Sequence, residues 1–129
     1  MLVQYTAAAL AAENRTLCCP ASIQSVPTGA NFEDVVSMSM TAALKAREVV
    51  ENTARILAIE LLCAFQALWL RGPEKAGAGT RAAYEFLSSK GLRPVEEDRP
   101  TDRDIELITS LVLEGRLVEA VEEEVGGLS

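Results

Sequence analysis

The feature that most constrains the fold is a stretch from Phe32 to Arg71 that contains neither glycine nor proline. Because these two residues are the strongest helix breakers, the stretch predicts one continuous helix of roughly 39 residues, about 58 Å long at 1.5 Å per residue. Asn31 can cap its start, and Glu33 and Asp34 then fall in its first turn, where carboxylates suit the helix dipole. Its second half has few polar residues in any direction. We therefore expect other chains, or another part of the same chain, to cover it.

Shorter helices are predicted on both sides of the long one. They cover residues 2–15, 81–89 (capped by Thr80 and ended by Gly91), 101–114 and 117–125. The first is apolar on nearly every side, so we expect it to be buried all round. A loop at 19–31, which contains Pro20, Pro27 and Gly29, separates it from the long helix, and loops of this length often carry function. The pattern predicts an all-α fold in which residues 1–129 form one helical region and the helix at about 32–71 belongs to a multi-chain helical bundle.

The composition argues against several classes of partner. The net charge is −7 and the 12 basic residues are scattered, which disfavours nucleic acid. There is no histidine, and Cys18, Cys19 and Cys63 are unsuitably spaced for zinc. We therefore expect reduced thiols, a cytoplasmic protein and no metal site. The apolar run 56–70 is shorter than the roughly twenty residues that span a bilayer and is interrupted by Glu60 and Gln66, so no membrane insertion is expected.

One carboxylate is a candidate for chemistry on position alone. Glu33 directly follows the loop that contains proline and glycine. It can complement the helix dipole, which is worth about 0.3–1 kcal/mol, or it can hold a substrate ammonium group or accept a proton. Without a family resemblance, the spacing favours dipole complementation over a role in chemistry.

Short strings distributed in order along nearly the whole chain carry a more specific signal. They are QYTAAAL at 4–10, EN at 13–14, PAS at 20–22, SVPT at 25–28, ED at 33–34, VSM at 36–38, LAIELL at 57–62, QAL at 66–68, GTRAAY at 79–84 and DRP at 98–100. Each is weak alone. Together they resemble the carboxy-terminal part of the histidine ammonia-lyases, which are aromatic amino acid ammonia-lyases with a methylidene-imidazolone electrophile.

The resemblance implies a mostly helical enzyme that is a tetramer, with active sites assembled from more than one subunit. Such an enzyme eliminates ammonia from an aromatic L-amino acid, in this family histidine to urocanate, as in histidine catabolism. Its electrophile forms from an internal Ala-Ser-Gly, which this chain lacks, because Ala21-Ser22 is followed by Ile23. We therefore expect the chain to be inactive alone, with no cofactor of its own. A homo-oligomer or a companion chain that carries the electrophile would complete the site.

The resemblance also assigns roles to residues. It makes Glu33 the catalytic residue that meets the substrate and assists proton handling, and Phe32 a substrate-binding residue. Phe32 stands where the family usually has glutamine, Val35 where it commonly has histidine, and Cys19 where histidine is frequent. An apolar wall suits a phenyl or phenol ring better than imidazole, since a missing hydrogen-bond partner costs about 1–3 kcal/mol.

Three alternatives therefore stay open. The chain can be a fragment of a tyrosine or phenylalanine lyase or aminomutase. It can be a non-catalytic helical assembly or scaffold protein. It can also be an isolated helical bundle that binds a small ligand.

Overall fold

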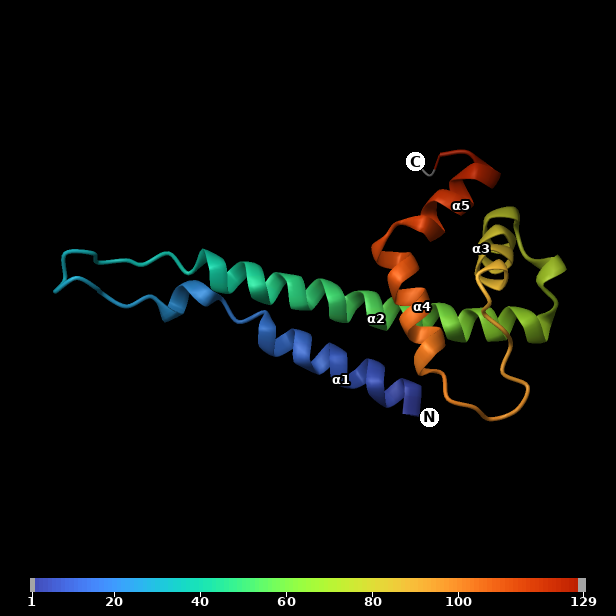
Figure 1. Ribbon diagram of the computed structural model, residues 1–129, viewed down its shortest axis with the longest axis horizontal. Helices are drawn as coiled ribbons and strands as arrows, with labels where there is room; N and C mark the ends of the chain where they lie inside the picture. The colour runs from blue at the N-terminus through green and yellow to red at the C-terminus, as the bar shows by residue number, and fades with distance from the viewer. Residues whose placement is uncertain (1, 128–129) are drawn as a thin grey trace. The chain divides into compact units, whose positions relative to one another are not determined.

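A computed structural model describes residues 2–127, which divide into two compact units: unit 1, residues 2–53, and unit 2, residues 54–127 (Figure 1). The described residues contain five α-helices, two single-turn 3₁₀ helices and no strand beyond one isolated bridge. The helices are α1 (Leu2–Leu17), α2 (Ser39–Arg71), α3 (Ala78–Ser89), α4 (Asp102–Leu113) and α5 (Arg116–Val125), with η1 (Ala21–Gln24) and η2 (Pro73–Lys75). The predicted all-α class with one long central helix is confirmed.

The long helix begins later than predicted. It has 33 residues and starts at Ser39, so the prediction of a helix from Phe32 is wrong for the first seven positions. Asn31 does not cap it, because Asn31 has φ 67° and belongs to a turn. Just before the actual start of α2, the Ser37 Oγ accepts the Ser39 N–H at 3.4 Å. Val35 and Val36 are β-branched, which disfavours helix, and the Val36 N–H is bonded to the Ser25 side chain instead.

Unit 1 joins α1 to the amino-terminal part of α2 through a polar contact. Asn52 is buried, with 2% of its surface exposed. Its Nδ2 donates to Glu13 Oε2 at 3.0 Å and to Asn14 Oδ1 at 3.1 Å, and Asn14 Nδ2 donates to Thr53 Oγ1 at 3.3 Å. No described residue of α1 is buried, so residues 2–127 do not provide the all-round burial that the apolar sequence predicted for this helix.

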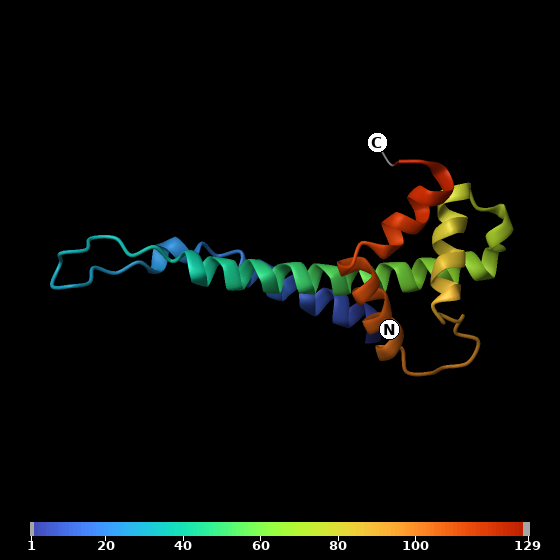
Figure 2. The same ribbon diagram turned by 45° about the horizontal axis from the view of Figure 1, so that its top comes forward.

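Unit 2 encloses the carboxy-terminal part of α2 with α3, α4 and α5 (Figure 2). Its core consists of buried apolar side chains from α2, α3, α4 and the turn after α3: Ala58, Leu62, Phe65, Leu87, Leu92, Ile108 and Leu111. The rings of Phe65 and Tyr84 stack with their centroids 4.5 Å apart. Small and branched aliphatic side chains dominate this core.

The sequence predicted the end of α3 correctly but not its start. The helix starts at Ala78 with Gly77 as its cap residue, so Thr80 lies inside the helix and the prediction that it caps the start is wrong. The other end is as predicted: Gly91 has φ 98°, its N–H bonds the Ser88 carbonyl, and the Leu92 N–H returns to the Leu87 carbonyl. A residue with positive φ is needed at this position to close the helix end, and glycine adopts it without steric cost.

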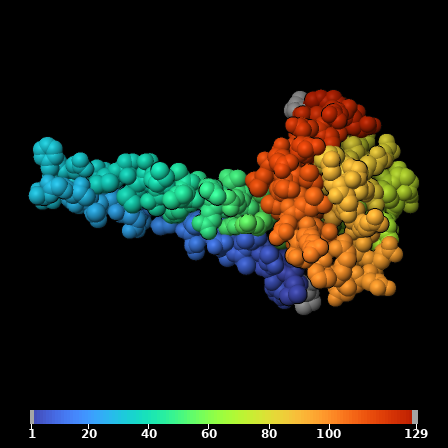
Figure 3. All heavy atoms as spheres, viewed as in Figure 1, coloured from blue at the N-terminus to red at the C-terminus, as the bar shows by residue number. Residues whose placement is uncertain are grey.

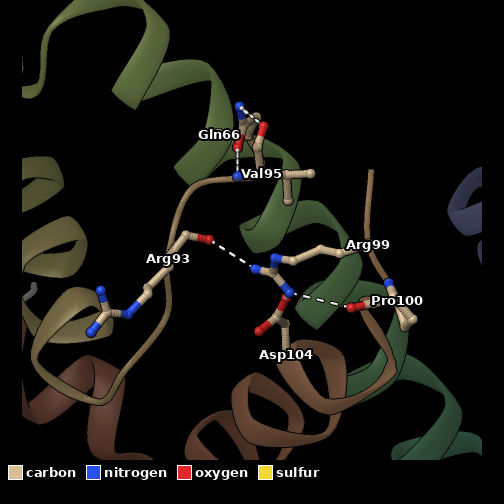
Figure 4. Close-up of polar contacts among 6 residues, drawn as sticks. All are labelled: Gln66, Arg93, Val95, Arg99, Pro100 and Asp104. Atoms are coloured by element: carbon tan, nitrogen blue, oxygen red, sulfur yellow. Dashed lines mark hydrogen bonds and ion pairs between the residues drawn. The ribbon is translucent and has the colours of Figure 1, made fainter. Parts of the chain in front are cut away.

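The extended segment between α3 and α4 is held by side chains (Figure 4). The Gln66 amide donates to the Val95 carbonyl at 3.2 Å and accepts the Val95 N–H at 2.8 Å, as a neighbouring strand would. Arg99 pairs with Asp104 at 2.6 Å and donates to the Arg93 carbonyl at 3.0 Å. Gln66, which interrupts the apolar run of α2, therefore satisfies backbone groups of the extended segment.

Several large apolar side chains of α2 remain exposed in this chain. Exposed fractions are 72% for Met40, 57% for Leu44 and Val50, and 69% for Leu70. By length and apolar composition α2 also passes the criteria for a membrane-crossing helix, which core helices of soluble proteins pass as well. The expectation that α2 does not insert into a membrane stays a prediction.

The core of unit 2 predicts that two leucines of α4 contribute very differently to the free energy of unfolding. Leu111 is 5% exposed and Leu113 is 52% exposed. We expect Leu111→Ala to lower the free energy of unfolding by about 2–5 kcal/mol, because it leaves a cavity. Leu113→Ala, the matched control, should cost less than about 1 kcal/mol. Urea unfolding of the chain, followed by circular dichroism, measures both, and equal losses would contradict the core assignment.

Candidate functional site

The segment between η1 and α2 reverses direction in a short hairpin that carries both predicted site residues. The Thr28 N–H donates to the Glu33 carbonyl at 3.0 Å, and the Glu33 N–H donates to the Thr28 carbonyl at 3.3 Å. Three consecutive residues between them have positive φ: Gly29 at 58°, Ala30 at 55° and Asn31 at 67°. This left-handed turn is possible because glycine and asparagine accept such angles readily.

A second contact holds the base of the hairpin. Ser25 Oγ accepts the Val36 N–H at 2.9 Å, which ties the outgoing segment to the incoming one. Within unit 1, the hairpin extends beyond the ends of α1 and α2 in Figure 1, and Figure 3 shows no other part of unit 1 covering it on the face drawn. Two sets of hydrogen bonds therefore brace a loop that is otherwise open to solvent.

Glu33 lies in this hairpin rather than in the first turn of a helix. The interpretation that the Glu33 carboxylate complements the dipole of α2 is therefore wrong, since the first turn of α2 contains no acidic residue. Its Oε2 accepts the Thr28 Oγ1 hydroxyl at 3.2 Å. Within residues 2–127 its Oε1 has no hydrogen bond, so this oxygen can accept a proton or the N–H of an ammonium group.

Apolar side chains flank the carboxylate along the chain. Phe32 is 93% exposed and Val35 is 77% exposed, while Val26 on the incoming segment is 61% exposed. Nothing in unit 1 encloses these side chains. The hairpin thus combines one partly oriented carboxylate with apolar surface, a combination that suits a ligand bearing both an amine and an aromatic ring.

Thr28 and Ser25 support the candidate site, and the sequence interpretation overlooked both. Thr28 orients the carboxylate and pairs with the backbone of Glu33, and Ser25 supports the loop. Both belong to the string SVPT that contributed to the family resemblance, but neither type of contact has a pattern in the sequence. Cys19 lies outside the hairpin, in the turn between α1 and η1.

Residues 1–89 match the family model for aromatic amino acid lyases. The chain belongs to this family. It is 49% identical over 128 residues to the histidine ammonia-lyase of Natranaerobius thermophilus, a match that covers 99% of this chain and 25% of that protein. The chain therefore spans about a quarter of the length of the curated relatives it matches.

Two solved structures share this fold. A tyrosine aminomutase from Streptomyces globisporus superposes with a TM-score of 0.87 at 39% identity, over 94% of this chain and 23% of that one. A histidine ammonia-lyase from Trypanosoma cruzi gives a TM-score of 0.84 at 42% identity, over 92% and 23%. The resemblance inferred from the short sequence strings is confirmed.

The hairpin base gives a testable consequence. We expect Ser25→Ala to speed hydrogen exchange at the Val36 amide about fivefold, because the variant loses one hydrogen bond worth about 1 kcal/mol. Exchange measured by nuclear magnetic resonance checks this. Ser22→Ala is the control, since the Ser22 hydroxyl bonds nothing in the described residues, and it should leave the Val36 amide unchanged. Equal rates in the wild type and Ser25→Ala would contradict the contact.

Proposed function

We propose that this chain is the carboxy-terminal part of an ammonia-lyase that removes ammonia from an aromatic L-amino acid, with L-histidine as substrate and urocanate as product. The observation that carries the proposal is the 49% identity to a histidine ammonia-lyase over 99% of the chain. The hairpin supports it, because it presents a carboxylate to solvent on a braced turn.

Glu33 is the catalytic residue of the proposal and Phe32 contributes to substrate binding. The Oε1 of Glu33 accepts a hydrogen bond from the substrate ammonium group or takes up a proton during elimination, while Thr28 holds Oε2. Phe32 offers an exposed ring beside the carboxylate in sequence. An aromatic side chain on the substrate would pack against such a ring.

The electrophile has to come from a segment outside these residues. The family forms it from Ala-Ser-Gly, and when present it converts the substrate amine into a better leaving group. Here Ala21-Ser22 belongs to the 3₁₀ helix η1 and is followed by Ile23, so the tripeptide is absent. The 129 residues alone are therefore proposed to be inactive.

Further protein is also needed to cover the helices. No described residue of α1 is buried, and Met40, Leu44 and Val50 of α2 are more than half exposed. Apolar surface of this extent favours association. We propose a homo-oligomer, or a companion chain that carries the electrophile, with the active site completed by residues from more than one polypeptide in the cytoplasm.

A second substrate class is favoured by the hairpin itself. Phe32 and Val35 are apolar and exposed next to Glu33, so they cannot hydrogen-bond an imidazole ring. Among the solved structures, the match to a tyrosine aminomutase covers 94% of this chain and that to a histidine ammonia-lyase covers 92%. A tyrosine or phenylalanine lyase or aminomutase is therefore the alternative, and a non-catalytic scaffold is the outcome if no reaction is found.

The test is complementation with the missing part of a relative. The chain is combined with the part of the Natranaerobius enzyme outside the matched quarter, which we propose to be its amino-terminal three quarters. The mixture is incubated separately with histidine, phenylalanine and tyrosine. Ultraviolet absorbance reports urocanate, cinnamate or coumarate, and chromatography reports any isomeric amino acid. We expect activity with the mixture and none with either part alone.

The role of Glu33 has its own variant in this assay. Glu33→Gln should lower kcat by about 10²–10⁴-fold, the usual contribution of a general acid or base. Glu123→Gln, which removes an exposed carboxylate of α5, is the matched control and should keep full activity. Full activity of Glu33→Gln would contradict the catalytic role. If the relative's own carboxy-terminal quarter restores activity and this chain restores none with any amino acid, the lyase function is wrong.

A further inference from the structure

Two adjacent cysteines line one groove of unit 1, at the end of α1. Cys18 and Cys19 are free and exposed. Both line a groove of about 430 Å³ whose other walls are largely apolar side chains from the end of α1, from η1 and from α2, including Leu17, Ala42 and Val49. The family resemblance notes only that Cys19 stands where histidine is frequent and assigns no role to this groove, and neither Phe32 nor Glu33 lines it.

The backbone around the two cysteines is fixed on both sides. The Cys18 N–H donates to the Asn14 carbonyl at 3.0 Å, which continues the last turn of α1, and the Cys19 N–H donates to the Thr16 carbonyl at 3.2 Å. The ammonium group of Lys45, from α2, donates to the Cys19 carbonyl. Neither sulfur makes a hydrogen bond or a disulfide within residues 2–127. The main chain is thus held while both sulfur atoms stay available.

We propose that Cys18 and Cys19 form a vicinal dithiol site that binds a soft trivalent centre, an organic arsenic(III) compound, through both sulfur atoms. Thiolates select soft centres over the hard cations that carboxylates bind. A zinc ion would require more ligands than two, and the described residues contain no group of three or more histidine, cysteine or carboxylate side chains that could hold a metal. A centre that needs only two thiols fits this donor set.

The reaction with an arsenoxide is a condensation. Two As–S bonds form, the As=O bond breaks, and the oxygen leaves as water with the two thiol protons. Arsenic stays trivalent and both sulfurs keep their oxidation state, so no oxidant or reductant is needed. Cys63 is exposed on α2 but has no adjacent thiol, and it can form only one such bond.

The experiment uses the full chain and phenylarsine oxide as the probe. Native mass spectrometry should show one adduct per chain, heavier by one phenylarsine oxide minus one water, and it should resist a monothiol while a 1,2-dithiol removes it. Cys18→Ser and Cys19→Ser should each weaken binding about 100-fold, because the second bond of a linked pair forms intramolecularly. Cys63→Ser is the matched control and should bind like the wild type.

Two outcomes would overturn the proposal. Wild-type affinity in Cys18→Ser or Cys19→Ser, with the same helix content by circular dichroism, would show that one thiol suffices. Equal affinity of the wild type in buffer and in concentrated urea would show that the fold does not build the site, since we expect the folded chain to bind about tenfold more tightly through preorganisation of two side chains. The result is separate from the lyase proposal, because the assay needs no complementing chain and no turnover.

Discussion

Helix α2 is the constraint on which the rest of the structure depends, because both compact units use part of it. Its amino-terminal half pairs with α1 through the buried amide of Asn52, and its carboxy-terminal half supplies Ala58, Leu62 and Phe65 to the core of unit 2. A helix of 33 residues without glycine or proline has no internal breaking point. Each unit is therefore assembled around its own segment of this helix.

The units satisfy this constraint in different ways. Unit 2 surrounds its part of α2 with three short helices and buries Ile108 completely. Unit 1 has only α1 and relies on polar contacts, while Met40, Leu44 and Val50 of α2 stay exposed. The apolar surface left on unit 1 is the reason that we propose further polypeptide around it, either from an oligomer or from a companion chain.

The hairpin depends on the backbone conformation of three consecutive residues. Gly29, Ala30 and Asn31 turn in the left-handed region, and this turn places Glu33 opposite Thr28 instead of at a helix start. The sequence interpretation failed here because asparagine followed by acidic residues is also the signature of a helix cap. Local propensity could not separate the two, since the competing hydrogen bonds come from Ser25 and Thr28, which lie several residues upstream. Because these hydrogen bonds have no local signature in the sequence, Ser25 and Thr28 were not predicted as parts of the site.

The amino-acid sequence by itself determined the helical class, the uninterrupted run of α2 as far as Arg71, the end of α3 at Gly91 and membership of the lyase family. These features follow from helix-breaking residues, from the periodicity of apolar residues and from short sequence strings. Each of these signals lies within a few neighbouring residues. Only the tertiary structure decided where α2 begins, which side chains of α4 are buried, how Gln66 satisfies the backbone of Val95, and how the Glu33 carboxylate is held. These features depend on contacts between residues distant along the chain or on competition between alternative hydrogen bonds, which no local pattern encodes.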